Sequence, residues 1–182
     1  MRIISGFHKG RKIKAPVSIN VRPTTDKAKE SLFNILNNRY TWSRIKVLDL
    51  FSGTGNISYE FGSRGVQEIV SVDKSKRCID FIKKTAIDLN LPIVTKNIEV
   101  IEYLSQNLEI YDIIFMDPPY FFDKKDYRNI IKKIYDNEML AKGLIIIEHS
   151  SKIDLSEFEN FTEKRTYGNN CFSFLMNKKA GL

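Results

Sequence analysis

An aspartate, two prolines and a tyrosine stand together at residues 117–120, directly after an apolar stretch with the composition of a strand. Proline donates no ladder hydrogen bond and restricts the residue before it, so the strand must end at Asp117. A carboxylate and the carbonyl oxygen of Pro118 can accept both N–H bonds of an exocyclic amine, while Tyr120 offers a ring on which a flat base stacks. The motif indicates chemistry on a base amine, although a strand-terminating turn with an aromatic lid would look the same.

The two prolines also make this turn rigid, so the accepting groups are fixed before any base arrives. We therefore predict a catalytic set made of Asp117, Pro118, Pro119 and Tyr120. Phe121 follows directly and is predicted to extend the stacking surface as a substrate contact.

A second candidate site is the stretch LDLFSGTGNIS at residues 48–58, where a buried strand turns into a helix through Gly53 and Gly55. Glycine permits positive φ and close approach of a ligand, and a helix N-terminus offers free N–H groups. Asp73 ends the next strand twenty residues after Gly53, the spacing at which a carboxylate binds ribose hydroxyls. The pattern predicts a nucleoside-containing cofactor, whereas the glycine pair alone would also fit a plain tight turn.

Asp49 distinguishes between two cofactors that share this glycine pattern. An anion beside the pyrophosphate of NAD would be repelled, whereas the ammonium group of S-adenosylmethionine would be attracted, and Ser58 replaces the third glycine of the dinucleotide fingerprint. Asn97 ends the third strand, where it would contact adenine or only cap the strand. We predict S-adenosylmethionine, with these cofactor-binding residues: Asp49, Phe51, Gly53, Gly55, Asp73, Asn97 and Ile98.

The elements that must position these residues alternate along the chain. Predicted strands cover 46–51, 68–73, 93–97, 111–117 and 143–150, and predicted helices cover 24–39, 56–64, 75–90, 100–107 and 124–140. Strands this continuously apolar indicate a parallel sheet covered by helices on both faces, which places residue 117 beside the glycine turn. Residues 161–168 and 170–178 predict an antiparallel hairpin at the end of the sheet, and residues 1–6 and 11–16 a short hairpin before it. The predicted fold class is α/β and Rossmann-like.

The composition narrows the class of protein. With 182 residues, 42% of them hydrophobic, the chain suits a single domain with one well-buried core. Its apolar runs are too short for a membrane span, and its N-terminus is basic where a signal peptide would be apolar, so we expect a cytoplasmic monomer. Cys78 and Cys171 are isolated and no CxxC pair occurs, so no metal site is expected.

The net charge of +7 is concentrated at the N-terminus, because residues 1–25 carry six Lys or Arg residues and no Asp or Glu. Such a run suits phosphate contacts with a nucleic acid, although it can also be a merely solvated face. We predict a basic extension over residues 1–25, a catalytic core over 26–182, and substrate contacts at Lys9, Arg11 and Lys12.

Three segments carry a resemblance to a known family: MRIISGFHKGRKI at 1–13, RPTTDKAKESLFNIL at 22–36 and DLFSGTGNISYEFGSRG at 49–65. With DPPY and the later YGNNCFSFL they closely resemble the RsmD family, bacterial 16S rRNA guanine-N2 methyltransferases that use S-adenosylmethionine. The resemblance implies a seven-stranded class I methyltransferase sheet with the last strand antiparallel, and methylation of a guanine, position 966, in 16S rRNA of the small ribosomal subunit. It also implies that Arg22 and Thr24 approach the RNA or its flipped base.

Three other functions remain open from the residues alone. An adenine-N6 DNA methyltransferase would share DPPY, although the chain leaves no room for a separate DNA-recognition domain. An NAD-linked oxidoreductase would need a proton donor, and the only histidines are His8 and His149. A nucleic-acid-binding protein with an inactive cofactor pocket would have no need of the acids at 49, 73 and 117.

Overall fold

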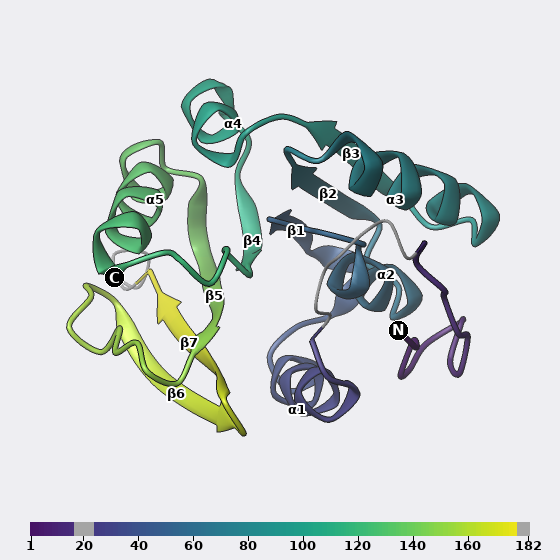
Figure 1. Ribbon diagram of the computed structural model, residues 1–182, viewed down its shortest axis with the longest axis horizontal. Coiled ribbons are helices and arrows are strands. Elements are labelled where there is room, and N and C mark those ends of the chain that lie inside the picture. Colours follow the sequence, from purple (N-terminus) through teal and green to yellow (C-terminus); the bar gives the residue numbers. More distant parts are fainter. Residues whose placement is uncertain (17–23, 178–182) are drawn as a thin grey trace.

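The computed structural model describes residues 1–16 and 24–177, and a seven-stranded sheet runs through its centre (Figure 1). The strands are β1 (Lys46–Leu50), β2 (Glu68–Asp73), β3 (Ile93–Asn97), β4 (Tyr111–Met116), β5 (Leu140–Ser150), β6 (Phe161–Tyr167) and β7 (Asn170–Met176). Their order is β3-β2-β1-β4-β5-β7-β6, and β7 alone runs in the direction opposite to the other six strands. The predicted Rossmann-like sheet with an antiparallel last strand is confirmed, and β7 lies between β5 and β6.

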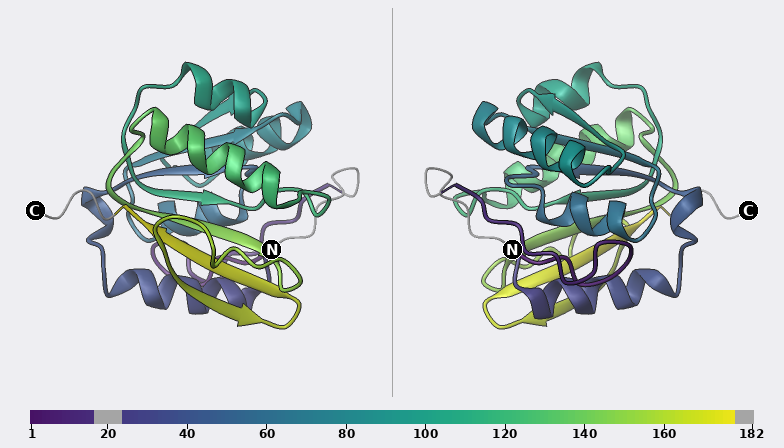
Figure 2. Two further views of the ribbon diagram at one scale, coloured as in Figure 1. Left: turned by 90° about the vertical axis from the view of Figure 1, so that its left-hand side faces the viewer. Right: turned by 90° about the vertical axis from the view of Figure 1, so that its right-hand side faces the viewer.

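Helices cover both faces of the sheet (Figure 2). Helices α1 (Asp26–Asn37), α2 (Asn56–Ser63) and α3 (Lys76–Asp88) lie on one face, and α4 (Val100–Gln106) and α5 (Lys124–Asp136) on the other. Phe33 and Phe61 pack at 4.7 Å between ring centroids in the first layer, and Leu104 and Ile134 are fully buried in the second. Because both faces are buried, the strands are apolar throughout, as the sequence predicts.

Side-chain caps fix where the helices begin. The side-chain oxygens of Thr25 and Ser75 accept hydrogen bonds from the third backbone N–H of α1 and α3, and Asp123 forms a capping box at the start of α5. The prediction for α5 was wrong at its end, because the helix stops at Asp136 and the chain turns at Glu138, which has a φ of 50°. Strand β5 therefore begins three residues earlier than predicted.

The N-terminal arm, residues 1–16, lies along α2 and α3 (Figure 1). The predicted hairpin is reduced to one antiparallel bridge between Arg2 and Lys12, while Ile3 and Ile13 are buried beside Tyr59. At Gly6 a Cβ atom would lie 1.8 Å from a backbone oxygen of α2, so only glycine allows so close an approach. The arm is thus held against the helix that follows the glycine turn.

Within residues 1–16 and 24–177, no helix is both long enough and apolar enough to cross a membrane. In the same described ranges, no three His, Cys, Asp or Glu side chains are grouped so that they could hold a metal ion. Of the predicted substrate contacts, Arg22 lies outside the described residues.

Candidate active site

A crevice of about 490 Å³ opens at the carboxyl ends of β1, β2 and β4. Strand β4 pairs with β1, so the chain after Met116 is brought beside the glycine turn after Leu50. The predicted residues that line this crevice together are Thr24, Asp49, Phe51, Gly53, Asp73, Asp117, Pro118, Pro119, Tyr120 and Phe121. The proposed cofactor and base positions therefore share one site.

Asp73 shapes the glycine turn. Its carboxylate accepts hydrogen bonds from the backbone N–H groups of Gly53 and Ser75, each at 2.8 Å. Gly55, the N-cap of α2, has a φ of 81°, and a Cβ there would lie 2.8 Å from the ring of Tyr59. Since a carboxylate offers about four acceptor positions, Asp73 can bind ribose hydroxyls while it holds the turn.

Asp49 lies at the floor of the crevice, only 1% exposed. It accepts a short hydrogen bond from Ser58 Oγ, which in turn lies 2.7 Å from Ser71 Oγ. Burial raises the pKa of the Asp49 carboxyl to about 7, against the opposing effect of the Ser58 hydrogen bond. A cation bound beside Asp49 would favour the ionised form, as the ammonium group of a methionine moiety does.

We expect the affinity for S-adenosylmethionine to rise with pH because of Asp49. Below its pKa of about 7 the carboxyl is protonated and must lose its proton when the cation binds, so binding weakens there and levels off above. Between pH 6.0 and 7.5 the dissociation constant should fall by about eightfold in calorimetric titrations. In Asp49→Asn this pH dependence should disappear, and an unchanged dependence would contradict the assignment.

Aromatic rings form one wall of the site. Phe51 has a φ of 58°, a strained value for a bulky residue, and its ring packs at 5.5 Å and 84° against Phe122. Phe122 in turn contacts the ring of Tyr127 at 6.1 Å. Tyr120 and Phe121 are 64% and 80% exposed, so their rings are accessible to an incoming base.

Asp117 is half-buried, directly follows β4 and lies next to a buried acid, Glu148 of β5. Burial raises the pKa of Asp117 well above its usual range, and the negative charges of Glu148 and Asp49 raise it further. Glu148 accepts hydrogen bonds from Thr24 Oγ1 at 2.5 Å and from Asn170 Nδ2 at 2.9 Å. Asp49, Asp73 and Asp117 line the crevice itself, and three acids in one crevice favour a positively charged ligand.

Comparison with known proteins identifies the family. The family model described as Conserved hypothetical protein 95 matches residues 1–176. The putative rRNA methyltransferase YlbH of Bacillus subtilis is 34% identical over 180 residues, which cover 92% of this chain and 94% of YlbH. Ribosomal RNA small subunit methyltransferase D of Escherichia coli is 32% identical over 164 residues, or 88% of this chain and 76% of that protein. The chain belongs to the RsmD/YlbH family.

Solved structures agree with this assignment. The putative methyltransferase yhhF from Escherichia coli superposes with a TM-score of 0.83 at 25% identity, over 97% of both chains. SMU.776, a putative methyltransferase complexed with SAH, has the same fold, with a TM-score of 0.66 at 20% identity over 82% of this chain and 49% of that one. This RsmD/YlbH family member thus has the Rossmann-like fold of class I methyltransferases, as predicted.

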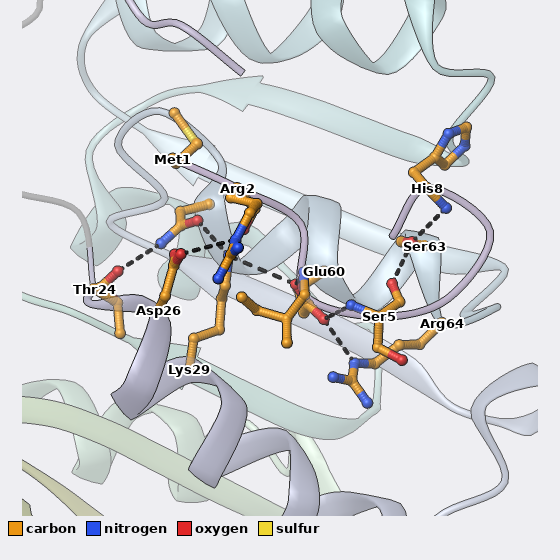
Figure 3. A network of polar contacts seen from close by, with 12 residues as sticks. Met1, Arg2, Ser5, His8, Thr24, Asp26, Lys29, Glu60, Ser63 and Arg64 are labelled. Carbon is orange, nitrogen blue, oxygen red and sulfur yellow. Dashed lines mark hydrogen bonds and ion pairs between the residues drawn. The ribbon is translucent and has the colours of Figure 1, made fainter. Parts of the chain in front are cut away.

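In this family member, a buried ion pair joins the N-terminal arm to the crevice (Figure 3). Lys29 of α1 is 1% exposed, and its Nζ donates to the carbonyl of Arg2 at 2.6 Å and to Asn56 Oδ1 at 2.8 Å. It lies 3.6 Å from Glu60 Oε2. Because Asn56 is the first residue of α2 and its Nδ2 donates to the carbonyl of Thr24 at 3.1 Å, the pair reaches the glycine turn and the crevice wall.

Glu60 fixes the arm itself. Its two carboxylate oxygens accept the backbone N–H groups of Ile4 at 2.8 Å and Ser5 at 3.1 Å, and Arg64 donates to Oε1 at 2.9 Å (Figure 3). Burial lowers the pKa of the Lys29 ammonium, and the Glu60 carboxylate opposes this effect. The network therefore holds the basic arm in one position relative to the site.

Other predicted residues lie apart from the crevice. Asn97 and Ile98 line a separate hollow of about 560 Å³ next to α4, and the Asn97 amide donates to the carbonyls of Asp73 at 3.1 Å and Lys74 at 2.8 Å. These hydrogen bonds of Asn97 stabilise the turn that contains Asp73. Lys9, Arg11 and Lys12 are exposed on the arm, and none of them forms an ion pair with the rest of the described chain.

Sequence reasoning missed Lys29, Asn56, Glu60 and Glu148, whose hydrogen bonds and ion pairs connect the N-terminal arm and Thr24 with the neighbourhood of the crevice. Two of these residues have a signal in the sequence that could have identified them. Glu148 directly follows the apolar run GLIII of its strand but is buried, and Lys29 lies next to Ala28 on the apolar stripe of α1. A charged residue at a core position is almost always paired, so the sequence predicts that Lys29 and Glu148 have partners but does not identify those partners.

Proposed function

We propose that this protein transfers the methyl group of S-adenosylmethionine to the exocyclic N2 amine of a guanine in 16S rRNA, in the free RNA or in the small ribosomal subunit. One observation supports this most directly: Asp117, Pro118 and Tyr120 lie in the same crevice as the glycine turn and Asp73. Family membership supports rRNA as the substrate class, and the resemblance of the sequence to the family supports position 966 as the target. Such a substrate supports a cytoplasmic location for the enzyme.

The residues present suit this cofactor, because one crevice offers a buried carboxylate for an ammonium group, a strand-end carboxylate for ribose hydroxyls and open backbone at a glycine turn. When bound, S-adenosylmethionine supplies a methyl group on a cationic sulfur. Asp49 is proposed to bind its ammonium and Asp73 its ribose. SMU.776, which has the same fold and is complexed with SAH, supports this proposal by analogy.

Methyl transfer requires that a poorly nucleophilic amine be aimed at the methyl carbon. Asp117 and the carbonyl of Pro118 accept the two N–H bonds, so the nitrogen lone pair points towards the cofactor. As the N–C bond forms and the C–S bond breaks, the sulfur keeps the electron pair and the amine loses one proton. Asp117, whose pKa is raised by burial and by neighbouring acids, can take this proton.

The test is methyl transfer from labelled S-adenosylmethionine to 16S rRNA and to small-subunit particles, with nucleotide-resolution mapping of the label. We expect label on the N2 amine of one guanine. Label on adenine of duplex DNA would instead support the adenine-N6 methyltransferase, and tighter binding of NAD than of S-adenosylmethionine in calorimetry would overturn the cofactor assignment.

The arm gives a separate prediction about RNA binding. Lys9, Arg11 and Lys12 are exposed, and each is expected to contact one phosphate. Replacing all three with alanine should weaken RNA binding and reduce the slope of log K against log salt by about 2 to 3, since each lost contact removes about 0.7 to 0.9. Fluorescence anisotropy at several salt concentrations measures this slope.

A matched triple variant controls for net charge. Arg77, Lys83 and Lys84 are equally exposed on α3, and their replacement with alanine removes the same three charges. This control should lower the affinity for RNA only weakly, through the loss of net positive charge, and should change the slope of log K against log salt less than the arm variant does. Equal slopes for the two triple variants would mean that the arm is only a solvated face.

A further inference from the structure

Thr24 belongs both to the crevice and to a buried hydrogen-bond chain. It is 7% exposed and lines the crevice together with Asp117 and Tyr120. Its Oγ1 donates to Glu148 Oε2 at 2.5 Å, and its backbone carbonyl accepts from Asn56 Nδ2 at 3.1 Å. Both the side chain and the backbone of Thr24 are therefore fixed before a base enters.

Glu148 determines which way the hydroxyl of Thr24 points. The acid is 2% exposed, and Asn170 Nδ2 holds its other oxygen at 2.9 Å. An ionised carboxylate only accepts hydrogen bonds, and a hydroxyl has one proton and two lone pairs. Since the proton of Thr24 is given to Glu148, its oxygen can offer only lone pairs to a ligand in the crevice.

Three polar groups that line the crevice with Tyr120 then offer acceptors to the edge of a base: the carboxylate of Asp117, the carbonyl of Pro118 and the hydroxyl oxygen of Thr24. Guanine presents N1–H and the N2 amine side by side, an edge made of donors. Adenine presents its N1 lone pair beside its amine, and that lone pair would face the lone pairs of Thr24. Such a mismatch of buried polar groups is a strong basis for rejecting a substrate.

We propose that Thr24, oriented by Glu148, accepts the N1–H of the target guanine and thereby selects guanine over adenine. Thr24 touches the base and determines specificity, whereas Glu148 acts through Thr24 and is a positioning residue. This inference rests on the proposed function, because it assumes that the exocyclic amine at Asp117 is the N2 amine of guanine.

The probe is 2-aminopurine, which keeps the amine at C2 but has a bare lone pair at N1. A synthetic RNA fragment with 2-aminopurine at the mapped position is ligated into 16S rRNA and compared with the guanine RNA. We expect kcat/KM of the unmodified enzyme to be at least tenfold lower on 2-aminopurine. Competition binding in the presence of SAH should show the same preference without turnover. Equal kcat/KM and equal affinity for the two RNAs would overturn the proposal.

Variants of Thr24 separate this role from a structural one. Thr24→Val keeps the shape of the side chain but removes the acceptor. It should lower kcat/KM on the guanine RNA and bring the ratio of kcat/KM for guanine over 2-aminopurine close to one. Thr24→Ser keeps the hydroxyl and should retain the preference for guanine. Thr95→Val on the edge strand β3 is the matched control and should behave as the unmodified enzyme. A Thr24→Val enzyme that retains the full preference would assign the selection to another residue.

Glu148→Gln tests the positioning role. The amide can donate to Thr24 Oγ1, which frees the hydroxyl proton for the N1 lone pair of 2-aminopurine, so the preference for guanine should narrow several-fold. A preference equal to that of the unmodified enzyme would remove Glu148 from the proposal.

Failure of the inference and failure of the proposed function look different. If the function is wrong, the unmodified enzyme labels no guanine N2 in 16S rRNA. If only the inference is wrong, guanine is labelled but 2-aminopurine is accepted equally well.

Discussion

Replacing Asp117 with alanine is expected to lower the turnover of methyl transfer by about 10³-fold or more, because it removes one of the two acceptors that orient the amine. Pro118 supplies only a backbone carbonyl, so no other side chain at the end of β4 can take over this task. Affinity for S-adenosylmethionine should change by less than about threefold, since the proposed ammonium and ribose contacts belong to Asp49 and Asp73. Single-turnover assays and calorimetry measure the two quantities.

The matched control for Asp117→Ala is Asp88→Ala, which removes an exposed acid at the end of α3 and changes the net charge equally. It should leave both quantities unchanged. Turnover of the Asp117→Ala enzyme within about tenfold of the unmodified rate would mean that the turn is structural and that the amine is oriented elsewhere.

The parts of the site that follow from strand topology were predictable. Buried apolar strands and a glycine turn indicate a parallel sheet, and Asp117 and Gly53 meet because the first and fourth strands are neighbours. The helices predicted to begin at residues 24 and 75 begin within two residues of those positions, because local capping by Thr25 and Ser75 decides where they start. In each case the structure is determined either by residues close together in the sequence or by the usual strand order of a parallel sheet.

The parts that depend on long-range polar contacts were not predictable. Lys29 and Asn56 are 27 residues apart, and Thr24 and Glu148 are 124 apart, and no periodicity encodes such pairs. The assignment of Asn97 to adenine recognition stays a prediction, since its amide is used in the turn beside Asp73. The N-terminal hairpin was overestimated because packing of Ile3 against α2 and α3 replaces strand pairing.

Glu60→Gln is expected to lower the free energy of unfolding by about 3 to 5 kcal/mol, the cost of removing one partner of a buried ion pair. Lys29 would stay buried without its counter-charge, and the amide would turn one donor towards the backbone N–H groups of Ile4 or Ser5. Urea denaturation measures the change. Glu68→Gln is the matched control, because its ion pair with Lys46 is exposed and should contribute less than about 1 kcal/mol.

The pair also predicts non-additivity. Lys29→Met alone leaves Glu60 with buried negative charge, still bonded to Arg64 and to two N–H groups of the arm. The double variant removes both charges, so its destabilisation should be smaller than the sum of the single effects by about 1 kcal/mol or more. Additive losses would mean that the two side chains act independently. A destabilised arm should weaken RNA binding as well, because the arm's basic residues then lose their fixed position relative to the crevice.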